Sequence, residues 1–289
     1  MEYRTLGRTG LRVSRLGFGG APAGLRRYLT ADDRDSPGFR RNLVGAIRAA
    51  VARGVTYFDT APGYGDGLAE RLFGEALEGT RDRIVLATKF FFQEPWDPVA
   101  ATRSLRESLD RLRTPAVDLL QYHGGTFDDA LADRITASGV LDWLDEARRL
   151  GLTRLIGITA EAPSGGLERL LRSGRFDVGL FAYSLIYQGA CDYQRAPFGI
   201  IPYARSLGMG VAVMRPLTSG FLQKLLPLEF ADATPERVGR MALRFVLSTP
   251  EVDVAVAGMI SEAEVAANAA LADDTSDRYD LKVLHERYV

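Results

Sequence analysis

Short apolar runs alternate along this chain with longer stretches in which apolar residues recur every third or fourth position. The short runs are typical of strands buried on both faces, and the longer stretches have the periodicity of amphipathic helices. The predicted strands are residues 13–20, 55–58, 83–89, 117–123, 154–159, 176–182, 210–214 and 252–257. The predicted helices are residues 37–53, 68–77, 99–113, 141–150, 165–173, 200–207, 235–247, 261–271 and 281–288.

Strands that alternate with helices in this way indicate an α/β fold with a parallel sheet covered by helices. Eight such units in a chain of 289 residues favour a closed (β/α)8 TIM barrel over an open doubly wound sheet. Gly7-Arg8-Thr9-Gly10 lies between β-compatible flanks and predicts an N-terminal β-hairpin. No linker-like or low-complexity segment interrupts the pattern, so we expect residues 1–289 to form a single barrel domain.

Composition narrows the classes of partner. The chain has 36 basic and 37 acidic side chains and a net charge of -1, which argues against nucleic acid as a partner. One cysteine, Cys191, and two histidines are too few for an internal disulfide or a Cys- or His-rich metal site, and suit a reducing compartment. The N-terminus lacks a signal-peptide pattern, and no apolar run approaches the ~20 residues that span a bilayer. We expect a cytoplasmic protein that acts on a small molecule without metal, nucleic acid or membrane.

Four titratable residues stand at or just after the carboxyl ends of three neighbouring predicted strands. Asp59 follows one strand and Tyr64 lies on the loop after it, while Lys89 and His123 end the next two strands. Active sites of such barrels lie at these strand ends, so we expect the four side chains to converge on one mouth. Each residue alone has a plain explanation, as a cap or turn acid, a loop-packing phenol, a surface lysine or a bonded core histidine. The position of all four at strand ends favours a catalytic role over these structural ones.

The four residue types fit one reaction. A free tyrosine titrates near ~10, and an adjacent ammonium lowers that value. Lys89 supplies the ammonium, and Asp59 holds it charged in a buried site. Tyr64 could then donate a proton to a carbonyl oxygen, which His123 orients by a hydrogen bond. The set holds no nucleophile or metal, so the other half of the reaction requires a nicotinamide or flavin that carries hydride.

The same segments resemble the motifs of the aldo-keto reductases. The resemblance is carried by Phe58-Asp59-Thr60-Ala61 with Tyr64-Gly65, by Ala87-Thr88-Lys89 and by Leu119-Leu120-Gln121-Tyr122-His123, and it extends from Leu6 to Asn268. It implies that Asp59, Tyr64, Lys89 and His123 are a catalytic tetrad. It also implies an NAD(P)(H)-dependent oxidoreductase whose nicotinamide dinucleotide is bound without a Rossmann fold.

The cofactor half of the resemblance is less complete. Residues 214–220 and 258–261 look like the family's dinucleotide loops, and Arg215 would place positive charge near the pyrophosphate unless it is a surface arginine. The sequence departs from the family at Met214, where an aromatic is common, at Thr159-Ala160, where Ser-Asn is common, and at Leu180, where glutamine is common. The cofactor-binding residues implied are Gly19, Gly20, Thr159, Met214, Arg215, Leu217, Ser219, Gly258 and Asn268, although Gly19-Gly20 could equally be a plain turn.

The resemblance implies NADP(H), whereas the local charge leaves NAD(H) open. A ribose 2′-phosphate requires nearby Arg or Lys, yet residues 253–277 contain neither. Glu264 stands where many relatives carry arginine. We interpret it as one half of a capping box with Ser261, three residues earlier.

The substrate pocket is expected to use the aromatic stretch at residues 90–96. We predict Trp96 and Phe90 as substrate-binding residues, with lid packing as the alternative; Phe127 and Tyr187 are further candidates. The preferred function is the interconversion of a carbonyl compound (aldehyde, ketone or aldose) and an alcohol, with Tyr64 as general acid and base. The alternatives are a non-catalytic, cofactor-binding regulatory member of the same fold and an isomerase or lyase that uses Lys89 as a Schiff-base amine. Asp59 opposes the last because it keeps the amine charged.

Overall fold

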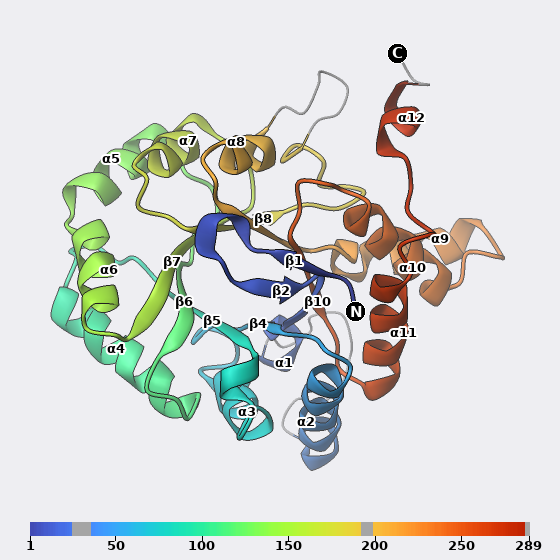
Figure 1. Cartoon of the computed structure of the whole chain (residues 1–289), viewed down its shortest axis with the longest axis horizontal. Helices are drawn as coiled ribbons and strands as arrows, with labels where there is room; N and C mark the ends of the chain where they lie inside the picture. Colours follow the sequence, from blue (N-terminus) through green and yellow to red (C-terminus); the bar gives the residue numbers. More distant parts are fainter. Residues whose placement is uncertain (25–35, 192–198, 287–289) are drawn as a thin grey trace.

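The structure of the protein is a computed structural model that describes residues 1–24, 36–191 and 199–286 (Figure 1). Its core is a closed barrel of parallel strands in the order β10-β3-β4-β5-β6-β7-β8-β9, which confirms the predicted (β/α)8 architecture. The barrel strands are β3 (Leu16–Gly19), β4 (Tyr57–Asp59), β5 (Val85–Phe90), β6 (Val117–Tyr122), β7 (Thr153–Ala160), β8 (Val178–Ala182), β9 (Gly210–Met214) and β10 (Val254–Gly258).

Helices surround the barrel and cover the outer faces of its strands (Figure 1). They are α1 (Ala21–Gly24), α2 (Pro37–Ala52), α3 (Leu68–Ala76), α4 (Pro98–Arg111), α5 (Asp129–Ala137), α6 (Val140–Arg149), α7 (Gly165–Arg172), α8 (Ile200–Ser206), α9 (Phe221–Glu229), α10 (Pro235–Leu247), α11 (Glu262–Asp273) and α12 (Leu281–Glu286). Every predicted helix is present to within a few residues, although the predicted end of the last one, residues 287–288, lies outside the described residues. The sequence pattern missed α1, α5 and α9. Helix α9 contains Pro227 and buries none of its side chains, so it has no core-facing stripe to detect.

The predicted hairpin is formed by β1 (Tyr3–Thr5) and β2 (Arg12–Ser14), which pair antiparallel around a 3-10 turn at Gly7–Thr9. The predicted strand at residues 13–20 is in fact two strands, because the chain leaves the hairpin at Arg15 and enters the barrel at Leu16. The Arg15 side chain is buried and donates to the carbonyls of Leu247 and Val252. Leu6 and Val13 of the hairpin are buried in the cluster inside the barrel, so the hairpin covers one end of the barrel (Figure 1).

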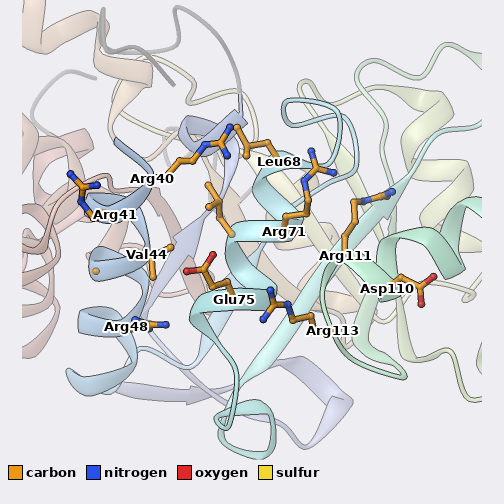
Figure 2. A pocket seen from close by; sticks show the side chains of 12 residues that line it. Arg40, Arg41, Val44, Arg48, Leu68, Arg71, Glu75, Asp110, Arg111 and Arg113 are labelled. Carbon is orange, nitrogen blue, oxygen red and sulfur yellow. The ribbon is translucent and has the colours of Figure 1, made fainter. Parts of the chain in front are cut away.

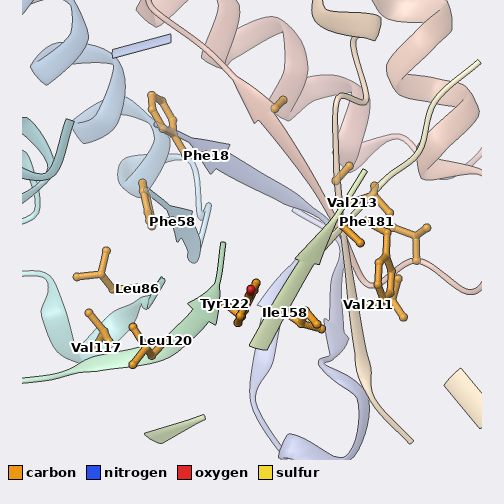
Figure 3. Close-up of a cluster of buried hydrophobic side chains, with 14 of the residues drawn as sticks. Phe18, Phe58, Leu86, Val117, Leu120, Tyr122, Ile158, Phe181, Val211 and Val213 are labelled. Carbon is orange, nitrogen blue, oxygen red and sulfur yellow. The ribbon is translucent and has the colours of Figure 1, made fainter. Parts of the chain in front are cut away.

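Alternation along the strands decides which side chains face the barrel interior. In β5, Val85 and Ala87 belong to the cluster inside the barrel, whereas Leu86 and Phe90 belong to the cluster between strands and helices. Figure 3 shows this outer layer on several strands. Because side chains alternate between the two faces of a strand, Lys89 also faces the barrel interior, and Phe90 lies among the outer aromatic side chains.

Candidate active site

Asp59 and Lys89 form a buried ion pair at the carboxyl ends of β4 and β5. The Lys89 Nζ lies 2.5 Å from Asp59 Oδ1 and 2.8 Å from the carbonyl oxygen of Thr60. The lysine is 2% exposed. Burial lowers the pKa of Lys89, but the charges of Asp59 and Tyr64 and hydrogen bonds with both side chains outweigh burial and raise it above its ordinary value. The buried amine is therefore held as an ammonium.

Gln121, on the adjacent strand β6, completes the shell of Asp59. Its Nε2 donates to Asp59 Oδ2 at 2.7 Å, and the strand register sets Gln121 opposite Lys89. Space for this amide comes from Gly157 in β7, where a Cβ would lie 2.9 Å from Gln121 Cγ. Each carboxylate oxygen of Asp59 thus accepts a separate hydrogen bond, which fixes the plane of the carboxylate.

Tyr64 lies against the lysine on the loop between β4 and α3. The Lys89 Nζ is 5.0 Å from the centroid of the Tyr64 ring. The Tyr64 carbonyl accepts from the Ala69 amide at 3.2 Å, and the Gly67 amide donates to Pro62 at 2.8 Å. Gly67 has a φ of 78° and is the N-cap of α3, a conformation that favours glycine. The start of α3 therefore holds the tyrosine loop in place.

His123 follows β6 and faces Tyr64. The two ring centroids are 5.9 Å apart at 88°, and Phe91 stacks on the imidazole at 4.5 Å. Burial, and then the positive charge of Lys89, lower the pKa of His123 from 6.5 to about 3. Its ring is therefore neutral near pH 7, and its buried Nδ1 has no partner among the described residues.

These four side chains converge on one cleft of about 220 Å³ at the carboxyl ends of the strands. Of the predicted cofactor-binding residues, the cleft lining includes Gly19, Thr159, Met214, Arg215, Leu217, Ser219 and Gly258. Gly20 is not among them; its amide donates to the Asp59 carbonyl at 2.7 Å. The Thr159 hydroxyl accepts from the Gly124 amide and donates to the Gly124 carbonyl, both at 2.9 Å, so it is already engaged.

Arg215 lies in the cleft wall as a partner of Glu161. Its Nε and one terminal nitrogen each lie 2.8 Å from a different oxygen of Glu161, and another nitrogen lies 3.0 Å from Ser219 Oγ. The guanidinium also lies 5.6 Å from the centroid of the Tyr187 ring. A bidentate pair of this kind is geometrically specific. Since each ion pair in the lining balances itself, the cleft has no excess charge.

A second hollow, the α10–α11 groove, continues from the cleft and shares Pro22, Leu217 and Gly258 with it. Its volume is about 860 Å³, and Asn268, one of the predicted cofactor-binding residues, lines it. Arg237 and Arg240 of α10 also line it, opposite Glu264. The Glu264 amide donates to Ser261 Oγ, which is one half of the expected capping box, whereas the Glu264 carboxylate accepts at 2.7 Å from the amide of Ile260, the residue before the N-cap. The groove therefore contains arginines from α10, outside residues 253–277.

The two predicted substrate-binding residues do not line the cleft. Phe90 is buried against Trp143 and Tyr122, with ring centroids 4.8 Å and 5.4 Å away, and Trp96 packs 5.4 Å from Trp143. Phe90 faces outward because it follows the inward-facing Lys89, and Trp96 packs against it with ring centroids 6.1 Å apart, as the lid-packing alternative expects. Substrate contact by either residue stays a prediction. Phe91, 47% exposed and stacked on His123, is the aromatic of this stretch that borders the cleft.

Two further findings concern metal binding and membrane insertion. Within residues 1–24, 36–191 and 199–286, no group of three or more His, Cys, Asp or Glu side chains could hold a metal ion. Every helix in the same ranges is too short or too polar to cross a lipid bilayer.

Comparisons with known proteins agree with this geometry. The profile described as "Aldo/keto reductase family" matches residues 16–227. An "L-galactose dehydrogenase" of Arabidopsis thaliana is 31% identical, over 93% of this chain and 88% of that protein. A holo-form aldo-keto reductase from Bacillus halodurans superposes with a TM-score of 0.75 at 27% identity, over 100% of this chain and 96% of that chain. An aldo/keto reductase from Klebsiella pneumoniae, solved with NADP and acetate, superposes with a TM-score of 0.75 at 24% identity, over 100% of this chain and 95% of that chain. The family match spans β3 to β9 and therefore all four residues of the site.

Proposed function

This chain belongs to the aldo/keto reductase family, and we propose that it interconverts a carbonyl compound and an alcohol with Tyr64 as the general acid and base. The observation that carries the proposal is the buried ammonium of Lys89, which lies 2.5 Å from Asp59 and against Tyr64 at the cleft. An ammonium in this position favours the phenolate and makes the phenol a stronger acid. Tyr64 releases a proton to the carbonyl oxygen in reduction and recovers it in oxidation.

The remaining side chains support this proton transfer. Asp59 keeps Lys89 charged, and Gln121 orients Asp59 through its second oxygen. Neutral His123 is a hydrogen-bond donor for the carbonyl oxygen, because its low pKa keeps one ring nitrogen protonated and the other free. A donor of this kind polarises the oxygen without competing with Tyr64 as the acid.

The cleft and the α10–α11 groove together fit a nicotinamide dinucleotide, which supplies or accepts hydride when bound. Gly19 and Gly258 have no side chains in the cleft, and a Cβ on Gly258 would lie 2.4 Å from Pro22 Cγ. We propose that Met214, Leu217 and Ser219 hold the nicotinamide half and that Asn268 lies at the other half.

We propose NADP(H) as the cofactor, because Arg237 and Arg240 bring two guanidinium groups to the α10–α11 groove. NADP is also the ligand of the Klebsiella pneumoniae relative. The carboxylates of Glu236, Glu264 and Asp274 line the same groove and leave room for NAD(H).

The charge balance of the cleft favours a neutral, hydroxylated substrate. Glu161 neutralises Arg215, and the pair offers both acceptors and donors for hydroxyl groups. Phe91 and Tyr187 add aromatic faces of the kind that pack on the C–H side of a sugar ring. The named activity of the Arabidopsis thaliana relative is of the same chemical class. We therefore propose an aldose, oxidised at its hydroxyl carbon or reduced at its aldehyde.

A Schiff-base mechanism is disfavoured, because it needs a neutral lysine and the pKa of Lys89 is raised. A purely regulatory role would leave the ion pair, Gln121 and the neutral His123 without a purpose.

The test of the proposed function is Tyr64→Phe. Turnover of aldehydes and aldoses should fall by at least about a hundredfold, while NADPH still quenches intrinsic fluorescence with unchanged affinity. The matched control is Tyr57→Phe, because that phenol is buried inside the barrel and its hydroxyl has no partner among the described residues. Turnover retained in Tyr64→Phe would exclude Tyr64 as the acid, and failure of the unaltered protein to bind either NADPH or NADH would exclude the reaction class.

A further inference from the structure

A groove lined by arginines lies on the outside of the barrel, away from the cleft. It runs between α2 and α3 and is closed by the end of α4, as Figure 2 shows. Its volume is about 780 Å³, and it shares no residue with the cleft or with the α10–α11 groove. We name it the arginine groove after Arg40, Arg41, Arg48, Arg71, Arg111 and Arg113, which line it.

The positive charge of the arginine groove is only partly balanced by acids. Arg111 pairs with the buried Glu70 at 2.7 Å, and Arg113 pairs with Glu78 at 3.2 Å. Arg71 donates to a backbone carbonyl, that of Asp66, at 3.2 Å. Neither Arg41 nor Arg48 has an ion-pair or hydrogen-bond partner in the described part of the chain. This separates the groove from the many surface arginines of this protein that are bound to carboxylates.

Two acids, Glu75 and Asp110, also line the arginine groove, but they do not balance the positive charge of its six arginines. Glu75 lies in the middle of the view in Figure 2, and the carboxylate of Asp110 points away from the other labelled side chains. Arg41, Arg48 and Arg71 come from two helices and are all exposed. Arg48 on α2 and Arg71 on α3 stand on the two sides of the groove, whereas the Arg41 side chain extends away from it and adds positive charge at its edge (Figure 2).

The floor between these cations is apolar. Val44 and Leu72 are buried beneath the arginine groove, and Leu68 is partly exposed beside them. A floor of this kind binds the apolar or aromatic body of a ligand, while the arginines bind its charged end. The combination is specific for a ligand that has both parts.

We propose that the arginine groove binds a small phosphorylated molecule with an apolar or aromatic body, which is the chemistry of a nucleotide. Guanidinium groups match phosphate oxygens in bidentate geometry, and a tetrahedral phosphate offers oxygens to several of them at once. A nucleic-acid strand fits less well, because the chain as a whole has a net charge of -1 and gains little from a long run of phosphates.

The proposal is tested by calorimetric titration of the full chain with pyrophosphate and with ATP. Both should bind saturably and more weakly as NaCl is added, and ATP should bind more tightly because its base reaches the apolar floor. In Arg41→Glu/Arg48→Glu the affinity for ATP should fall by roughly tenfold or more, since charge-assisted hydrogen bonds are lost. NADPH should still quench intrinsic fluorescence in this variant, which shows that it is folded.

The matched control is Arg149→Glu/Arg172→Glu, which makes the same change of charge on α6 and α7, on another flank of the barrel (Figure 1). It should bind ATP as the unaltered protein does. The proposal is overturned if neither probe binds saturably, if the Arg41→Glu/Arg48→Glu variant keeps full affinity, or if affinity is lost instead in Arg237→Ala/Arg240→Ala. The last outcome would assign the phosphate binding to the α10–α11 groove.

Discussion

The neutral state of His123 makes the stability of this protein depend on pH in a way that can be measured without knowing the substrate. Burial, and then the charge of Lys89, lower the pKa of His123 from 6.5 to about 3 in the folded protein. Between these two values the unfolded chain binds a proton that the folded chain does not. The stability contributed by the neutral imidazole is therefore present above pH 6.5 and is lost as the pH falls toward 3.

The size of the effect follows from the two pKa values. The difference between the two pKa values corresponds to a contribution of roughly 5 kcal/mol to the free energy of unfolding, all of which is lost only below the lower pKa. Only part of it is lost over an accessible range. Between about pH 7 and about pH 4.5, linkage gives a loss of about 2–3 kcal/mol from His123 alone. That is a large fraction of a typical total stability of about 5–15 kcal/mol.

The assay is urea unfolding at about pH 7 and about pH 4.5, followed by circular dichroism. His123→Gln keeps a polar side chain of similar size but cannot bind a proton in this range. The variant should lose about 2–3 kcal/mol less than the unaltered protein on acidification, since all the carboxylates contribute to both chains alike. His285→Gln controls for the loss of a histidine elsewhere.

The reasoning is refuted if His123→Gln and the unaltered protein lose the same free energy of unfolding between the two pH values. A greater loss in the variant would also refute it, because it would mean that the folded state holds the protonated imidazole.

Two further predictions concern specificity. In Glu161→Gln, Arg215 loses its carboxylate partner and the cleft gains a positive charge, so kcat/KM for a carboxylated aldehyde such as glyoxylate should rise about tenfold relative to that for a neutral aldose. Steady-state kinetics with both substrates measures this, and an unchanged ratio would contradict a selective role for Glu161. In Arg237→Ala/Arg240→Ala, the Kd for NADPH should rise about tenfold or more while the Kd for NADH stays the same, as measured by fluorescence quenching. Equal effects on both cofactors would argue against a 2′-phosphate site at these arginines.

The barrel and the convergence of the four side chains could be predicted because both depend on local patterns. Apolar runs identify the strands, and the end of each parallel strand identifies the mouth. Alternation along the strands also determines two further positions. With Lys89 facing inward, Phe90 has to face outward, and the register of β5 and β6 sets Gln121 beside the same carboxylate.

The rest of the site depends on packing between segments that are distant in sequence. Glu161 follows β7 and Arg215 follows β9, and no local pattern predicts that they pair. Arg237 and Arg240 reach the α10–α11 groove only because two helices pack side by side.

Closure of the barrel has a consequence for how the protein is made. The ring of strands is completed when Ala255 pairs with Leu16, near opposite ends of the chain, and the carbonyls that receive Arg15 belong to Leu247 and Val252. Until the last strand leaves the ribosome, one edge of the first barrel strand has no neighbour and a guanidinium group has no acceptor. Such late, long-range pairing is slow and leaves open strand edges that favour aggregation. A polypeptide that stops short of residue 254 would therefore remain an unsealed sheet, a natural substrate for chaperones and proteases, even though it holds all four side chains that converge on the cleft.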